Sequence, residues 1–129
     1  MTDKTRMKCL RAALALLGVF FITLLPMFML SIWRSGWAWE WQDGHISHFT
    51  WMILAIYMTL GVFFLLAIRD PLKHSSLIWF TVWSSVAHAG VMTYSAIIDP
   101  LERGHLVGDI PALVVLALVF GILMPRKAS

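Results

Sequence analysis

The amino-acid sequence predicts an all-α membrane protein, a four-helix antiparallel transmembrane bundle with both termini in the cytoplasm. Of its 129 residues, 60% are hydrophobic and only 13% are charged, whereas soluble domains have about 45–50% apolar and about 25% charged residues. Long apolar runs alternate with short polar segments, and about 20 apolar residues suffice for a helix to cross a bilayer. We expect one transmembrane domain over residues 1–129, with spans at about 12–33, 49–68, 77–98 and 106–124.

The first span follows a short basic segment that contains four lysines and arginines before residue 12. A cleaved signal peptide has the same basic start, but its apolar core is only about 7–15 residues long and small residues follow it. Here the apolar run continues to Ser31-Ile-Trp-Arg34, so we expect a retained helix. Pro26 should bend this helix because proline removes one backbone hydrogen bond.

Five of the seven tryptophans surround the first loop, at positions 33, 37, 39, 41 and 51. Indole rings prefer the headgroup region of a bilayer, with the apolar body inward and the N–H group toward water. This cluster is typical of an interfacial anchor, and the alternative is an aromatic lid over a site at that membrane face.

The ends of the later spans carry clear signals. Residues 49–68 are followed by Arg69-Asp-Pro71, and residues 77–98 are followed by Asp99-Pro100; proline cannot continue a helix and disfavours helical backbone just before it. The last apolar run, 110–124, reaches only about 22 Å, which is short of a hydrocarbon core of about 30 Å. We therefore expect this helix to begin near Leu106, or the bilayer to be thinned, and we expect Asp109 to cap the helix.

The lysines and arginines predict the orientation. Eight of the ten lie before the first span, between the second and third spans, or after the last span, whereas Arg34 and Arg103 lie on the other side. Cytoplasmic loops carry an excess of these residues. We therefore expect a multi-pass protein of the bacterial cytoplasmic (inner) membrane, surrounded by the lipid bilayer, and no nucleic-acid partner because no basic patch with interleaved aromatics is present.

A polar stripe runs along one face of the third span. Its members recur at steps of three and four residues, which places them on one helical side: Thr81, Ser85, His88, Met92, Ser95 and Asp99. The structural interpretation is that this seam packs the helices together inside the bundle, at about 0.6 kcal/mol for each interhelical hydrogen bond. However, an ionisable residue at membrane depth is a functional candidate. The candidate intramembrane site is therefore His88 and Asp109 with Ser84, Ser85 and Met92.

A second group of polar residues is expected at the outer face. Histidine nitrogens with carboxylate oxygens suit zinc, copper(II) or nickel, and the candidate metal residues are His45, His48, His105 and Asp99. The alternative is that they are ordinary solvated loop residues. His88 could itself be a proton relay, a metal or haem ligand, or a hydrogen-bond donor to a quinone, so a transition metal and a quinone are both open as cofactors.

A five-residue segment occurs twice. Leu17-Gly-Val-Phe-Phe21 recurs as Leu60-Gly-Val-Phe-Phe64, in two helices that should run in opposite directions. An inverted repeat is one interpretation. The other is coincidence, because five apolar letters match easily by chance and the flanking residues diverge.

The second half of the chain carries a resemblance to known proteins. Its strongest segments are residues 69–71, 76–80, 84–92 and 104–113, and over residues 69–115 they resemble a family of small uncharacterised bacterial four-helix membrane proteins. The layout is also loosely similar to the DoxX-like group. The family resemblance implies four spans and marks His88, His105 and Asp109, while the DoxX-like one implies an accessory role near quinone-linked oxidation.

Two functions remain open from the sequence. The first is a non-enzymatic accessory subunit, or a small homo-oligomer or part of a larger membrane complex, in which the polar seam is structural. The second is a site protein that binds a transition metal, a proton or a quinone-like molecule through His88, His105 and Asp109. No glycine-rich phosphate loop, nucleophile elbow or His-Glu-x-x-His motif is present in the sequence, so no enzymatic reaction is indicated.

Overall fold

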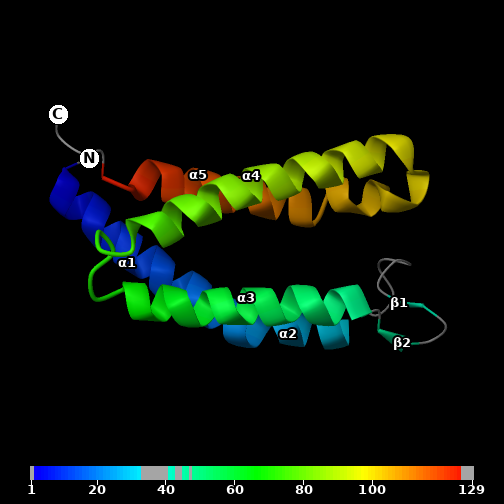
Figure 1. The fold of residues 1–129 in the computed structure, drawn as a ribbon, viewed down its shortest axis with the longest axis horizontal. Helices are drawn as coiled ribbons and strands as arrows, with labels where there is room; N and C mark the ends of the chain where they lie inside the picture. The colour runs from blue at the N-terminus through cyan, green and yellow to red at the C-terminus, as the bar shows by residue number, and fades with distance from the viewer. Residues whose placement is uncertain (1, 33–40, 43–44, 47, 126–129) are drawn as a thin grey trace. The chain divides into compact units, whose positions relative to one another are not determined.

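The computed structural model describes residues 2–32, 41–42, 45–46 and 48–125, and it confirms a helical protein (Figure 1). Four helical segments are joined by short connections in this described part of the chain. In chain order the elements are α1 (Asp3–Val19), a π-helix (Phe20–Leu24), α2 (Leu25–Met27), a second π-helix (Phe28–Ile32), the strands β1 (Trp41–Gln42) and β2 (His45–Ile46), α3 (His48–Ala67), α4 (Ser75–Ile98), a 3-10 helix (Pro100–Leu106) and α5 (Asp109–Leu123).

Three helical segments are long and apolar enough to cross a membrane: Asp3–Leu30, His48–Ala67 and Glu102–Leu123. They expose large apolar side chains, among them Leu16 and Ile56, which are 73% and 65% exposed. Because water-soluble monomers rarely expose large apolar patches, these helices indicate a membrane protein. The segment 75–98 is not among the three: α4 carries no formal charge, but its serines, threonines and histidine lower its hydropathy.

The first helix starts at Asp3, well before the apolar run that begins at residue 12. Its first turn is closed by Thr2, whose Oγ1 accepts a hydrogen bond from the backbone N–H of Thr5 at 3.4 Å. The Thr2 carbonyl accepts from the N–H of Arg6 at 2.9 Å. A threonine at this position satisfies backbone donors that have no partner within the helix. The basic segment is therefore helical and continuous with the apolar run.

Pro26 lies in the short α2, between two π-helical segments. Because proline has no backbone N–H, the hydrogen bond to the carbonyl four residues earlier cannot form. Wider i→i+5 turns are a known way for a helix to accommodate such a break. The expected disturbance at Pro26 thus takes the form of π turns on both sides of it.

The described chain divides into two compact units, residues 1–13 with 67–129 and residues 14–66. In the first of them, α4 and α5 pack side by side and run in opposite directions (Figure 1). The buried side chains of this hairpin are apolar or small, which lets the two helix backbones approach closely. They include Ile78, Val82, Ala89 and Ala96 on α4, and Leu113, Leu116, Ala117 and Phe120 on α5.

In the unit of residues 14–66, the first helix and α3 cross at two glycines, Gly18 and Gly61. A Cβ atom on Gly18 would lie 2.7 Å from the Leu65 side chain and 3.1 Å from the Gly61 carbonyl oxygen. A Cβ atom on Gly61 would lie 2.8 Å from the Gly18 carbonyl oxygen and 2.9 Å from Ile22. Real Cβ atoms essentially never come closer than 3.0 Å to such neighbours. A side chain at Gly61 would therefore meet backbone of the first helix, whereas one at Gly18 would first displace the Leu65 side chain.

These two glycines belong to the repeated segment 17–21 and 60–64, and the two copies contact each other with two-fold character. Each glycine faces the other glycine and the residue four positions after that other glycine, so Gly18 faces Leu65 and Gly61 faces Ile22. The last residues of the copies also pair: the rings of Phe21 and Phe64 have centroids 5.9 Å apart, and both are buried. At all five positions the two copies share the same degree of burial. The repeated letters thus correspond to a repeated set of contacts.

Candidate functional site

The clearest polar cluster lies where α4 ends and α5 begins. The backbone N–H of Asp99 bonds to the Ser95 carbonyl at 2.8 Å, and Pro100 then starts the 3-10 helix that ends at Leu106. This turn packs against α4 and α5. It carries Glu102 and His105, and Asp109 is the first residue of α5. The end of one helix and the start of the next thus place three titratable side chains within eight residues.

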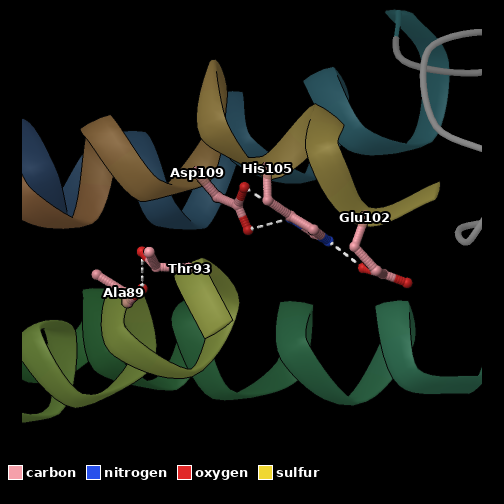
Figure 2. Close-up of polar contacts among 5 residues, drawn as sticks. All are labelled: Ala89, Thr93, Glu102, His105 and Asp109. Atoms are coloured by element: carbon pink, nitrogen blue, oxygen red, sulfur yellow. Dashed lines mark hydrogen bonds and ion pairs between the residues drawn. The ribbon is translucent and has the colours of Figure 1, made fainter. Parts of the chain in front are cut away.

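His105 is the centre of this cluster, and its side chain lies between two carboxylates (Figure 2). Its Nδ1 atom is 2.8 Å from both carboxylate oxygens of Asp109. Its Nε2 atom is 2.8 Å from Oε2 of Glu102. His105 is 1% exposed, whereas Glu102 and Asp109 are 29% and 30% exposed. The imidazole is therefore buried, and each carboxylate has an exposed portion.

Each contact of the His105 ring needs a proton between its two atoms to be a hydrogen bond. A carboxylate only accepts hydrogen bonds, and a ring nitrogen without a proton also only accepts. The two Asp109 oxygens are equally close to Nδ1, which is the geometry of an N–H group that points between the two oxygens of a carboxylate. The contact between Nε2 and Glu102 needs a second proton, on the ring or on the carboxyl group. Both contacts of the ring are therefore hydrogen bonds when one proton lies in each of them.

The spacing explains why these residues meet. Residues three and four apart are neighbours on a helix, and Glu102 and Asp109 lie three before and four after His105. The expectation that Asp109 caps the last helix is wrong, because the cap position is Gly108 and no side chain makes a cap hydrogen bond there. The Asp109 carboxylate bonds His105 instead. Glu102 lies in the same polar loop of the sequence as Asp99 and His105, but it was not chosen as a candidate site residue.

The other members of the predicted intramembrane site lie on α4. His88, Ser84 and Met92 are half-buried and Ser85 is buried. The Ser84 hydroxyl donates to the Thr81 carbonyl at 3.2 Å, which is a bond within the same helix. Of the residues predicted for this site, Asp109 is thus the one that the structure places in the His105 cluster.

Two threonine hydroxyl groups of α4 also bond to their own helix. Thr81 donates to the Leu77 carbonyl at 2.9 Å, and Thr93 donates to the Ala89 carbonyl at 2.7 Å (Figure 2). Such back-bonding to the carbonyl one turn earlier satisfies a hydroxyl within apolar surroundings. These two bonds therefore connect turns of α4 and do not link it to a neighbouring helix.

The predicted metal residues are distributed over both units. His45 lies in β2 and the exposed His48 begins α3, both in the unit of residues 14–66, whereas Asp99 and His105 belong to the other unit. Within the described ranges, no group of three or more histidine, cysteine, aspartate or glutamate residues has the arrangement of a metal site. Both ring nitrogens of His105 already face carboxylates, so a metal would have to displace one of them. Trp33, Trp37 and Trp39 lie outside the described residues.

Comparison with known proteins gives a family and no activity. A family model described as a family of unknown function (DUF6632) matches residues 4–129. The chain therefore belongs to this family. No curated protein and no solved structure matches the chain. The family does not connect the chain to the DoxX-like group or to bacteria, so those two parts of the sequence interpretation stay predictions.

Proposed function

We propose that this member of a family of unknown function is a four-span membrane protein that binds protons at its Glu102–His105–Asp109 cluster. One observation carries the proposal: a buried histidine bonded through both ring nitrogens to carboxylates that are themselves partly exposed. The buried ring can exchange protons with the surroundings through either carboxylate. Arg103 on the same turn is exposed and Asp99 before it is half-buried, and on α4 the titratable side chains are His88 and Tyr94.

The four-span arrangement is supported by the α4–α5 hairpin. The apolar segment Glu102–Leu123 has 22 residues; its α-helical part, the 15 residues of α5, spans about 22 Å, and the 3-10 helix precedes it. The 24 residues of α4 correspond to about 36 Å and pack along α5. If α5 crosses the bilayer, α4 crosses beside it. The cluster then lies at the outer membrane face, and both termini lie in the bacterial cytoplasm. A reporter protein fused at Ser129 should therefore give a cytoplasmic signal. A periplasmic signal would contradict this topology.

A proton is favoured over a metal or a quinone as the ligand. The three side chains already satisfy each other at 2.8 Å, and a metal ligand needs a nitrogen lone pair that points at the metal. The alternative function is an accessory subunit or small oligomer with a structural polar seam. It is supported less well, because the hydroxyls of Thr81 and Ser84 bond within α4. Disulfide cross-linking at Cys9, which is exposed, would detect a homo-oligomer.

Infrared difference spectroscopy of the full chain in liposomes tests the proton site directly. Acidification should produce carboxyl bands that change in Glu102→Gln and in Asp109→Asn, and both bands should shift in His105→Gln because the central ring couples them. Asp70→Asn is the matched control, since Asp70 is exposed and its carboxylate accepts a hydrogen bond from the backbone N–H of Lys73 at 3.3 Å. If acid-induced bands in the three cluster variants equal those of the wild type, the cluster does not bind protons.

A further inference from the structure

A second charged surface lies on the unit that contains residues 1–13 and 67–129. Lys4, Lys8 and Arg11 are spaced four and three residues apart on α1 and are all exposed. Residues at this spacing lie on one side of a helix. The helix therefore presents a row of three cations directly before its apolar part.

The loop between α3 and α4 adds two more cations to this row. Arg11 Nη2 donates a hydrogen bond to the Arg69 carbonyl oxygen at 3.3 Å, so the loop lies against the helix. Arg69 and Lys73 are both exposed. Leu72, between them, is an exposed apolar side chain at 52%. We refer to Lys4, Lys8, Arg11, Arg69 and Lys73 as the basic cluster.

Within the described residues, no acidic side chain forms an ion pair with the basic cluster. The nearby acids are Asp3 and Asp70, and within residues 2–32 and 48–125 no lysine or arginine forms an ion pair with a carboxylate. Arg6, which lies between Lys4 and Lys8, has a buried Nε atom without a hydrogen-bond partner in the described structure. Cations near a helix N-terminus also oppose the helix dipole. Anions bound at the exposed cations would offset this unfavourable interaction with the helix dipole.

We propose that the basic cluster binds the phosphate groups of anionic phospholipids. Clusters of four to eight lysines and arginines beside a membrane span are attracted to anionic headgroups by about 1 kcal/mol for each charge. Three of the five residues of the cluster lie in the first turns of the helical segment Asp3–Leu30, directly before its apolar part, and the other two lie in the loop against it. The exposed Leu72 lies where it can contact acyl chains while its neighbours contact phosphates, an arrangement seen for interfacial segments. This proposal does not depend on the proton site.

Native mass spectrometry of the full chain in detergent, with phosphatidylglycerol or phosphatidylcholine added, tests the proposal. We expect phosphatidylglycerol to bind more tightly. The triple variant Lys4→Gln, Lys8→Gln and Arg11→Gln should weaken its binding on the order of 100-fold, which corresponds to about fivefold for each charge. The double variant Lys4→Arg and Lys8→Arg should retain binding, and so should Arg103→Gln, which removes an exposed cation on the 3-10 helix.

Three results would overturn the proposal. The first is equal binding of the two lipids by the wild type. The second is an unchanged phosphatidylglycerol affinity in a folded triple variant, with folding checked by circular dichroism. The third is competition by glycerophosphate at the same concentration as phosphatidylglycerol, because that would make a free phosphate, and not a lipid, the ligand.

Discussion

Replacing Gly61 by alanine should destabilise the chain through one identifiable contact. The new methyl group would lie 2.8 Å from the carbonyl oxygen of Gly18 and 2.9 Å from Ile22. The first neighbour is backbone and cannot move without moving the helix. At Gly18 the nearest neighbour is instead the flexible Leu65 side chain, at 2.7 Å, with the Gly61 carbonyl at 3.1 Å. Gly61→Ala should therefore cost more than Gly18→Ala.

The magnitude follows from two opposing effects. Overpacking costs about 1–3 kcal/mol, and a clash with backbone should fall near the upper end. Alanine in place of glycine within a helix contributes about 1 kcal/mol in the other direction. We expect a net loss of about 2 kcal/mol in the free energy of unfolding for Gly61→Ala and a smaller loss for Gly18→Ala. Gly90→Ala is the matched control, since a Cβ atom there would meet nothing within 4 Å; it should stabilise by up to about 1 kcal/mol.

The assay is reversible unfolding of the four proteins in mixed micelles, followed by circular dichroism. Gly61→Ala and Gly90→Ala should differ by about 3 kcal/mol, the sum of the expected loss and gain. If the two variants are equally stable, the first helix and α3 do not cross at this glycine pair, and the reasoning is refuted.

Three further changes test other parts of the structure. Phe64→Ala should lower the free energy of unfolding by on the order of 2 kcal/mol, which is less than in a soluble core because lipid and not water surrounds the unfolded helices. Phe63 is adjacent and exposed, so Phe63→Ala should lower it much less. Equal losses for the two variants in micelle unfolding would contradict the placement of Phe64. Asp109→Ala should lower the free energy of unfolding by about 1–3 kcal/mol, because the buried His105 loses the carboxylate that it bonds. Asp70→Ala should change the free energy of unfolding little. Pro26→Ala restores a backbone N–H and should convert the flanking π turns to α-helix, which hydrogen exchange would detect as greater protection around residue 26; unchanged protection would argue against proline as their cause.

The sequence was sufficient for the helices because apolar runs and proline stops act locally. The ends of α3 and α4 lie within two residues of the expected ones, since Asp70-Pro71 and Asp99-Pro100 stop a helix by local chemistry. The first helix extends beyond the expected span to Asp3, because Thr2 caps a polar turn that hydropathy does not mark.

The candidate sites show where local reasoning ends. The contacts of His105 with Asp109 and Glu102 could be anticipated in part, because spacings of three and four bring side chains together on any helix. The contact between Gly18 and Gly61 could not, since it joins residues in helices far apart along the chain. A polar stripe such as that of α4 also does not reveal whether its hydroxyls bond to a neighbour or to their own helix, because both arrangements satisfy the same groups.

Nitrogen NMR of the histidine side chains is the most direct test of the proton site. In ¹⁵N-histidine-labelled full chain in liposomes, the His105 resonances, assigned with His105→Gln, should show a proton on Nδ1 and a hydrogen-bonded Nε2. Asp109→Asn should shift the Nδ1 signal and Glu102→Gln the Nε2 signal. A bare Nδ1 in the wild type, or His105 signals that neither variant changes, would contradict the shared-proton cluster on which the proposed function rests.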